Sequence, residues 1–342
     1  MSLMDTANEV VSIDLGASLV KLIVTDKKGA VVRAVVVPNR LGFSIPQETV
    51  QIERLKDLIN SIFKEHNLPK RGARLTLPES AVVTQVVSVP HLTDAELASS
   101  IAWQAEQYIP IPKEELELEY QVLYRPDKQN EQVENMRVLL IGIRRNLLNN
   151  FLAAFRGAGV EATLLETETV SLLRDLALPV NSPVTMVANF GASGMTVSVV
   201  RNGELTMAVN HGDGGDLMTK ALMNTFNLPS DKAEGYKIAY GLQRGVFEEK
   251  IYNALLPIAN IFLTDIKNSM AFFSTLDSLS VIERLIIAGG PAQMPGLMEF
   301  LMENLNLEIM PAAPFYGLEG NLPVDNLLLY PVVAGLAKKK SD

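Results

Sequence analysis

Two stretches of the sequence decide the fold, because each repeats the outline of the other. The first is "VSIDLGASLVKLIV" (Val11–Val24) and the second is "VANFGASGMTVSVV" (Val187–Val200). Each has an apolar strand, a Gly-Ala-Ser turn and a second apolar strand, which is the pattern of a tight hairpin. Where the first stretch has Asp14, the second has Asn189. The recurrence of the hairpin with matching flanks indicates two related lobes.

The surrounding pattern supports this division. After each hairpin the chain continues with a polar turn, "DKKG" in the first repeat and "RNGE" in the second, then a third strand and a helix. Between the two repeats, strand, helix, two strands and a helix could bury a small core of their own. We therefore expect an α/β fold in which the first lobe comprises residues 1–78 and 160–182, an inserted α+β subdomain residues 79–159, the second lobe residues 183–228 and 280–342, and a helical subdomain residues 229–279.

The composition excludes several classes of protein. The 342 residues are 48% hydrophobic, carry a formal net charge of -9 and include no cysteine. A net negative charge argues against a nucleic-acid surface, which needs clustered Lys and Arg. The lack of cysteine excludes disulfides, thiolate catalysis and cysteine-ligated metals. The sequence shows no signal-peptide pattern and no apolar run near the roughly 18 residues that a membrane span needs, so we expect a cytosolic protein.

The small residues of the hairpins and of a later turn predict a ligand site. Successive backbone N-H groups in a tight turn can cradle an anion, and two such turns facing each other would grip a chain of phosphates. In "LIIAGGPAQMPGL", Gly289 and Gly290 follow a buried strand and precede a helix, where a backbone without side chains lets a flat ligand approach. Taken singly, each segment also fits an ordinary turn.

A family resemblance rests on these motifs. In this order, Asp14-Leu-Gly-Ala-Ser, Asn189-Phe-Gly-Ala-Ser and Ala288-Gly-Gly resemble the phosphate 1, phosphate 2 and adenosine motifs of the actin-like ATPase superfamily. Actin, sugar kinases, heat-shock chaperone ATPases and FtsA belong to it. Nearly end to end, the chain is similar to the PilM family of type IV pilus assembly, most closely in "IAWQAEQYIPIPKEELELEYQVL" (Ile101–Leu123). The resemblance implies duplicated ribonuclease H-like lobes and an insertion in the first lobe.

The resemblance also implies ATP and Mg²⁺ as ligands. Asp14 and Asn189 would hold the metal through water, and Lys21 would reach the β-phosphate. The implied nucleotide-binding residues are Asp14, Gly16, Ala17, Ser18, Lys21, Asn189, Gly191, Ala192, Ser193, Thr196, Gly214, Gly215, Glu234, Lys237, Gly289 and Gly290. Glu166 and Glu168 lie in the segment that resembles the hinge, where related ATPases orient the attacking water. Either could be a catalytic base or structural.

Other interpretations of these residues stay open. Lys21 lies in an apolar strand and shares a face with Leu19 and Ile23, so it could be an edge-strand or snorkelling lysine instead. Glu234 and Lys237 could form a surface ion pair. His211 is expected to be a turn residue without a partner. Because an Asn in place of Asp brings no charge to the metal, the sequence favours ATP as a conformational ligand over rapid turnover.

The resemblance implies a partner as well. Proteins of this family hold the N-terminal peptide of PilN, an inner-membrane protein, in a groove between the first lobe and the inserted subdomain. We expect Arg144 and Arg145 at the rim of such a groove and Trp103 in the core. The protein would then be peripheral at the inner membrane through its partner, without inserting directly. Self-association is left open.

Two rival functions remain at this stage. One is an FtsA-like filament tethered to a membrane by a C-terminal amphipathic helix. The final stretch "PVVAGLAKKKSD" (Pro331–Asp342) is short for that purpose, and we expect it to pack on the second lobe. The other is a small-molecule kinase, which would need a placed carboxylate base and a polar substrate pocket.

Overall fold

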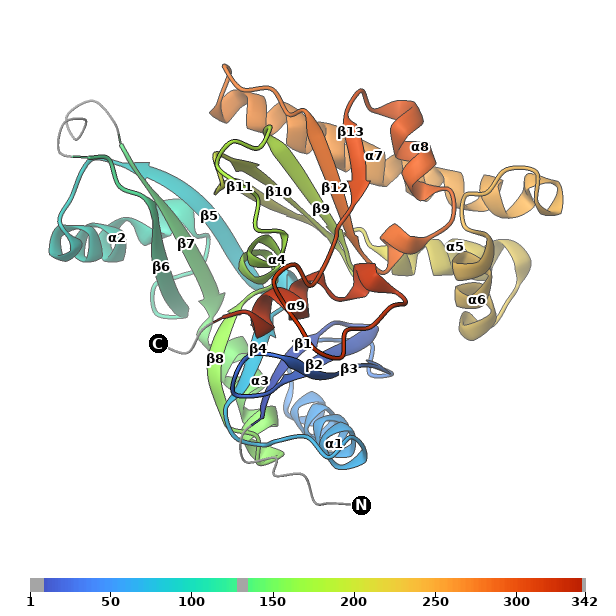
Figure 1. Ribbon diagram of the computed structural model, residues 1–342, viewed down its shortest axis with the longest axis horizontal. Helices are drawn as coiled ribbons and strands as arrows, with labels where there is room; N and C mark the ends of the chain where they lie inside the picture. The colour runs from blue at the N-terminus through green and yellow to red at the C-terminus, as the bar shows by residue number, and fades with distance from the viewer. Residues whose placement is uncertain (1–8, 128–134, 340–342) are drawn as a thin grey trace.

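The computed structural model describes residues 9–127 and 135–339, and it confirms the expected duplication. Two five-stranded sheets follow the same plan, a three-stranded antiparallel meander extended by two parallel strands. In Figure 1 one sheet lies above the other, and a third, smaller sheet projects to one side. Residues 128–134 lie outside the described residues.

The first sheet has the order β3-β2-β1-β4-β8. Its strands are β1 (Val10–Leu15), β2 (Leu19–Thr25), β3 (Val31–Pro38), β4 (Ala73–Leu77) and β8 (Ala162–Thr167). The helices of this part are α1 (Thr49–Glu65), α3 (Arg145–Gly157) and α4 (Glu168–Leu176). Apolar side chains from these strands pack against α1 and α3 in one buried cluster and against the C-terminal helix in another. Helices covering both faces of a sheet favour strands that are mostly apolar.

The second sheet has the order β11-β10-β9-β12-β13. Its strands are β9 (Thr185–Phe190), β10 (Met195–Arg201), β11 (Glu204–His211), β12 (Arg284–Gly289) and β13 (Glu308–Pro311). The helices around it are α5 (Gly215–Phe226), α6 (Ser230–Tyr240), α7 (Lys250–Leu276) and α8 (Leu297–Asn304). Phe190 of β9 and Phe262 of α7 meet edge to face in its core, with ring centroids 5.4 Å apart.

The third sheet has the order β5-β7-β6 and forms the inserted unit. Its strands are β5 (Val82–Val89), β6 (Leu116–Tyr124) and β7 (Met136–Arg144), and helix α2 (Asp94–Tyr108) packs on one face. Thr93 caps α2 in a reciprocal capping box with Glu96, as the sequence predicts. Trp103, expected in the core, is 77% exposed on α2. The expectation fails because Leu97, Ile101 and Ala105 already fill the buried face of the helix.

Helix α3 belongs to the core of the first lobe and not to the core of the inserted unit. Its Phe151 and Phe155 are fully buried in the same cluster as Leu55 and Ile59 of α1. We therefore propose that the insertion ends near Arg144, whereas the boundary at residue 159 drawn from the sequence includes this helix. Strand-helix patterns alone cannot show which core a helix joins.

The C-terminal helix α9 (Pro331–Ala337) lies between the two sheets, which corrects the expectation that it packs on the second lobe. Val333 shares a buried cluster with Ile23 of the first sheet. Only Val332 reaches a cluster of the second sheet, beside Val187. Short 3₁₀ turns complete the described fold at Glu79–Ala81, Phe247–Glu249, Pro291–Gln293 and Leu327–Leu329. No helix in the described residues has the length and apolar character required for a membrane span.

Candidate functional site

The two sheets enclose a cavity of about 690 Å³ where their parallel strands end. On one side its wall contains Asp14 near the end of β1, Glu79 just after β4 and Glu168 just after β8. On the other side it contains Asn189 in β9 and Gly289 at the end of β12. Carboxyl ends of parallel strands meet at one edge of a sheet, which is where α/β proteins bind ligands.

The structure brings together almost all of the residues implied for nucleotide binding. The cavity is lined by Asp14, Gly16, Ala17, Ser18, Lys21, Asn189, Gly191, Ala192, Ser193, Thr196, Gly215, Glu234, Lys237, Gly289 and Gly290. Gly214 is not part of the wall. It supports the second hairpin from behind, where a Cβ would lie 2.4 Å from the carbonyl oxygen of Ala192.

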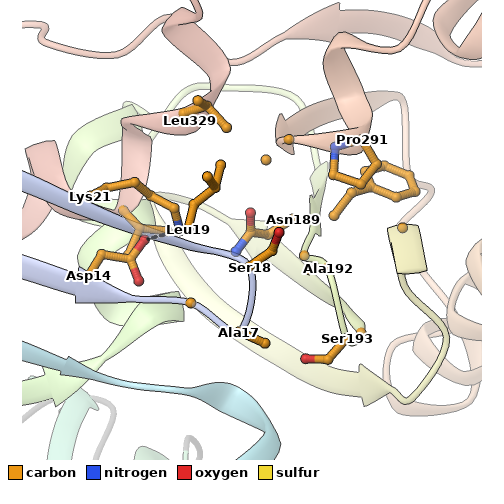
Figure 2. A pocket seen from close by; sticks show the side chains of 18 of the residues that line it. Asp14, Ala17, Ser18, Leu19, Lys21, Asn189, Ala192, Ser193, Pro291 and Leu329 are labelled. Carbon is orange, nitrogen blue, oxygen red and sulfur yellow. Dashed lines mark hydrogen bonds and ion pairs between the residues drawn. The ribbon is translucent and has the colours of Figure 1, made fainter. Parts of the chain in front are cut away.

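The two hairpins close with the same hydrogen bond and face each other across the cavity. Gly16 N-H donates to Leu19 O at 3.0 Å, and Gly191 N-H donates to Gly194 O at 2.8 Å. A Cβ on either glycine would lie 2.9 Å from that acceptor, so both turns need glycine for the same reason. Figure 2 shows the Ala-Ser pairs that follow these glycines on opposite sides of the cavity.

Lys21 and Asp14 form an ion pair in the wall of the first hairpin. Lys21 Nζ lies 2.7 Å from Asp14 Oδ2, and Thr76 Oγ1 donates to Asp14 Oδ1 at 3.2 Å. Burial disfavours charge on Lys21, but the carboxylates of Asp14 and Glu168 outweigh it and raise the lysine pKa. Strand β2 lies inside the sheet between β1 and β3, so an edge-strand lysine is excluded.

Two further carboxylates approach Asp14 from neighbouring strand ends. Burial raises the pKa of Glu168 to about 8, and the negative charges of Asp14 and Glu79 add to the effect while Lys21 opposes it. Burial also raises the pKa of Glu79, against hydrogen bonds that favour its charged form. Sequence reasoning missed Glu79, although "LPES" places it directly after a parallel strand, as Glu168 is after the next.

Glu166 has a structural environment. Its carboxylate pairs with Arg174, whose Nη2 donates to Glu166 Oε2 at 2.8 Å, and it also accepts from Ser171. Arg174 Nη1 donates in addition to the Gly335 carbonyl oxygen of α9 at 3.1 Å. Glu166 therefore ties β8 to α4 and orients the arginine that reaches α9. Of the two candidate bases, only Glu168 lies in the cavity wall.

The far wall of the cavity contains the predicted Glu234–Lys237 pair. Lys237 Nζ lies 2.7 Å from Glu234 Oε2 and donates to Thr219 Oγ1 at 2.9 Å and to Gly215 O at 3.2 Å. Lys237 is buried but the Glu234 side chain is 41% exposed, so the pair is only partly at the surface. Its contacts fix α6 against the start of α5, where the helix dipole favours negative charge.

Asn189 faces the cavity from the middle of the second sheet. It pairs in register with Thr196 of the second hairpin, and Thr196 Oγ1 donates to Asn210 Oδ1 at 3.2 Å. The loop before α9 closes the cavity from another side, through Asn326, Leu328 and Leu329. This loop was also missed, because its sequence has no motif and its place depends on the whole fold.

His211 has partners, which corrects the expectation of an unpaired turn residue. It ends β11, its Nε2 lies 2.9 Å from Ser269 Oγ, and its Nδ1 lies 3.4 Å from Asp265 Oδ1. Both partners belong to α7, far along the chain from His211. The contacts anchor the end of β11, beside the second hairpin, to α7.

The two arginines expected at a partner groove lie where β7 ends and α3 begins, and both contact residues near the start of β6. Arg144 pairs with Glu115, and Arg145 Nη2 donates to the Leu116 carbonyl oxygen at 2.9 Å. Arg145 Nε also lies 3.3 Å from Glu117. Their side chains are about half exposed, at 45% and 51%. Their role toward a partner stays a prediction.

The arrangement fits a phosphate ligand better than a metal bound by protein alone. Within the described parts of the chain, no group of three or more His, Cys, Asp or Glu side chains is placed to hold a metal ion. Mg²⁺ keeps several waters and is commonly held by one or two carboxylates together with phosphates. Asp14 and Asn189, on facing hairpin strands, suit a metal that arrives with a phosphate chain.

Two matching sheets with a cavity between facing hairpins define a protein of the actin-like ATPase fold. A family model described as "Type IV pilus assembly protein PilM" matches residues 12–336. The chain belongs to that family.

Solved structures and a curated relative agree with the fold. The chain is similar to a structure titled "PilM-PilN type IV pilus biogenesis complex", with a TM-score of 0.84 and 24% identity over 96% of this chain and 97% of that one. It is also similar to MreB5 of Spiroplasma citri bound to AMPPNP, with a TM-score of 0.54 and 12% identity over 96% and 94%. FtsA of Streptococcus pneumoniae serotype 2 (strain D39 / NCTC 7466) is 21% identical over 87% of this chain and 74% of that protein.

Proposed function

We propose that this chain is an ATP-binding scaffold of type IV pilus assembly that holds the N-terminal tail of a PilN-like inner-membrane protein. The observation that carries the nucleotide part is the pair of matched glycine hairpins on opposite sides of one cavity. Family membership and the similarity to the PilM-PilN complex support the pilus part.

In this proposal the triphosphate lies between the hairpins. Backbone N-H groups of Ala17, Ser18, Ala192 and Ser193 donate to phosphate oxygens, and Lys21 supplies a positive charge. Mg²⁺, when bound with the nucleotide, would neutralise phosphate charge and would be held through water by Asp14 and Asn189. The ribose and base would then lie near Glu234, Lys237, Gly289 and Gly290, which also line the cavity.

We further propose that hydrolysis is weak or absent. In this proposal Glu168 would be the carboxylate that orients a water, but its pKa of about 8 keeps it largely protonated at neutral pH. A protonated carboxyl cannot accept a proton from water. Asn189 also brings no charge to the metal. Both features suit a ligand that sets a conformation.

The partner is proposed to bind between the first lobe and the inserted unit. The sheet face opposite α2 points toward the rest of the molecule, and an extended apolar peptide needs such a wall with a few polar clamps. Arg144 and Arg145 at the end of β7 remain candidates for the rim. The protein would sit on the cytoplasmic side of the inner membrane through this partner, with no nucleic acid involved.

Calorimetry with ATP and Mg²⁺ tests the nucleotide part. Lys21→Met is expected to weaken ATP binding at least about tenfold, because it removes the cation facing the phosphates. Lys27→Met is the matched control, since Lys27 is exposed on the β2–β3 turn, and it should bind like the native chain. No ATP binding by the native chain would overturn the proposal.

A pull-down tests the partner part separately. The bait is the purified cytoplasmic tail of the PilN-like protein of the same organism, with and without ATP. Retention of the full chain on this tail, and not on a scrambled tail, is expected. No retention in either nucleotide condition would remove the scaffold part of the proposal and leave nucleotide binding standing.

A further inference from the structure

The inserted unit touches the second lobe as well as the first. Strand β5 packs against β11, the edge strand of the second sheet. Arg137 of β7 donates through Nε to Glu204 Oε2 of β11 at 3.2 Å, and its terminal nitrogen contacts the same oxygen. The Arg137 guanidinium also lies 4.4 Å from the centre of the Tyr124 ring.

This contact is better built than a surface ion pair. Both side chains are only 26% exposed, so solvent screens them less than it screens exposed charges. Two hydrogen bonds from one planar guanidinium, with an aromatic ring against it, fix the orientation of Arg137. The contact therefore has a defined geometry that a shift between the lobes would break.

Both strands at this contact lead back to the cavity. The chain enters β5 through Glu79, which lines the cavity, accepts from Thr169 N at 2.8 Å, and accepts from Thr84 Oγ1 of β5 at 3.3 Å. Strand β11 leaves the contact at Glu204 and reaches the cavity wall at Asn210, beside the second hairpin. Rigid secondary elements such as these strands can carry coupling between distant sites.

The inserted unit is thus tied to both lobes. Glu79 fixes the inserted unit to the wall of the first lobe, whereas Glu204 belongs to the edge strand of the second sheet. A ligand held by both hairpins fixes the distance between the sheets, and so the distance between Glu204 and the inserted unit. A ligand can shift such an equilibrium only if it binds the two arrangements differently, and a ligand that spans both hairpins does so.

We propose that the Arg137–Glu204 contact couples occupancy of the cavity to the position of the inserted unit, and thereby regulates the partner groove beside that unit. This inference rests on the proposed function, since it takes ATP as the ligand. By linkage, the partner tail changes ATP affinity by the same factor as ATP changes tail affinity.

The test uses the lack of cysteine in the native chain. Spin labels are attached to Trp103→Cys on α2 and Leu279→Cys after α7, where the native side chains are 77% and 94% exposed. Pulsed electron resonance then gives the distance distribution between the inserted unit and the second lobe, with and without ATP. We expect ATP to shift or narrow the distribution, and Glu204→Gln to abolish that response.

Glu308→Gln is the matched control, because Arg284 and Glu308 form an Arg–Glu pair within the second lobe alone. It should respond to ATP like the native background. Thr84→Val is a second test. It removes the hydrogen bond between β5 and Glu79 without adding charge, and it should reduce the change in the distance distribution on addition of ATP.

Calorimetry on the same labelled proteins separates the outcomes. If ATP binds and the distance distribution does not change, or changes equally in Glu204→Gln, the coupling is overturned and nucleotide binding stands. If ATP does not bind, the proposed function fails and this inference fails with it. Where the tail peptide also binds, we expect ATP to change its affinity at least about fivefold in the native chain, and less than about twofold in Glu204→Gln.

Discussion

At the scale of single residues, the cavity concentrates negative charge around one lysine. Asp14, Glu79 and Glu168 come from three neighbouring strand ends, and Lys21 is the cation paired with Asp14 among them. The uptake of a proton by Glu168 relieves part of this repulsion. Asn189 in place of Asp keeps a further carboxylate out of the same space. Having Asn189 where the first hairpin has Asp14 therefore reduces the negative charge that faces the cavity.

The Glu168 proton predicts a stability change with pH. Because its folded pKa of about 8 exceeds the ordinary glutamate value, the folded state binds the proton more tightly than the unfolded state does. The free energy of unfolding should therefore be highest below about pH 4.5, for this group alone, and fall as pH rises to 8. Calorimetric melting of the nucleotide-free chain at pH 6 and 8.5 measures the fall.

Glu168→Gln should remove that part of the fall, because the amide does not titrate. Glu299→Gln, at an exposed site on α8, should keep it. An equal pH dependence in native and Glu168→Gln proteins would contradict the assignment of the proton to Glu168.

Asn189→Asp is expected to make ATP binding depend more strongly on Mg²⁺. The new carboxylate would repel phosphates when no metal is present, with an expected loss of roughly tenfold in affinity, about 1.4 kcal/mol. With Mg²⁺ the added charge becomes a second metal-shell group, and most of the affinity should return. Calorimetry in EDTA and in Mg²⁺ compares the two conditions. An unchanged metal dependence would count against Asn189 as part of the metal shell.

At the scale of elements, the crossing of α4 and α9 joins the lobes. At Gly335 of α9 a Cβ would lie 1.7 Å from the Ser171 carbonyl oxygen of α4, so the helices touch backbone to backbone. Arg174 adds a hydrogen bond to the Gly335 carbonyl oxygen from the same helix. The crossing lies next to the cavity, whose wall includes Tyr330, Pro331 and Val332.

Gly335→Ala is therefore predicted to destabilise the protein by at least about 3 kcal/mol, because the helices would have to separate. Gly235→Ala is the control, since Gly235 lies in α6 and a Cβ there would have open space within 4 Å. That change should be neutral or stabilise by up to about 1 kcal/mol, through helix propensity. Urea unfolding of both variants gives the comparison. Equal stability would show that the crossing can open without loss.

The elements themselves were largely predictable, and their packing was not. Hairpin turns, strand alternation and helix capping are local sequence signals, and they correctly predicted both three-stranded meanders and the start of α2. Which core α3 joins, where α9 lies and whether Trp103 is covered depend on contacts between distant segments. The same holds for the site. The turn glycines predicted the two hairpins. The position of Glu79 in the cavity wall depends on the order of strands in the sheet, which the local sequence does not show.

At the scale of the whole molecule, the proposed site lies where the duplicated sheets face each other. The cavity, the α4–α9 crossing and the loop before α9 all lie between the two sheets. That loop also reaches across to the first sheet, where Val31 N donates to Glu319 O and Asn321 N donates to Val31 O, both at 2.7 Å. A ligand held by both hairpins would add to these connections, so its effect should appear as stability of the whole chain.

ATP with Mg²⁺, at 100 times its dissociation constant, is predicted to stabilise the folded protein by about 2.7 kcal/mol. For a chain of this size, the usual entropy of unfolding per residue converts that into a rise in melting temperature of about 4 °C. Scanning calorimetry suits the measurement, because Trp103 is exposed and reports core unfolding poorly. Adenosine at the same concentration as ATP should give a much smaller rise, because without phosphates to contact the hairpins it should bind more weakly. A rise as large as that with ATP would show that the base side alone holds the ligand and that the paired hairpins do not grip it.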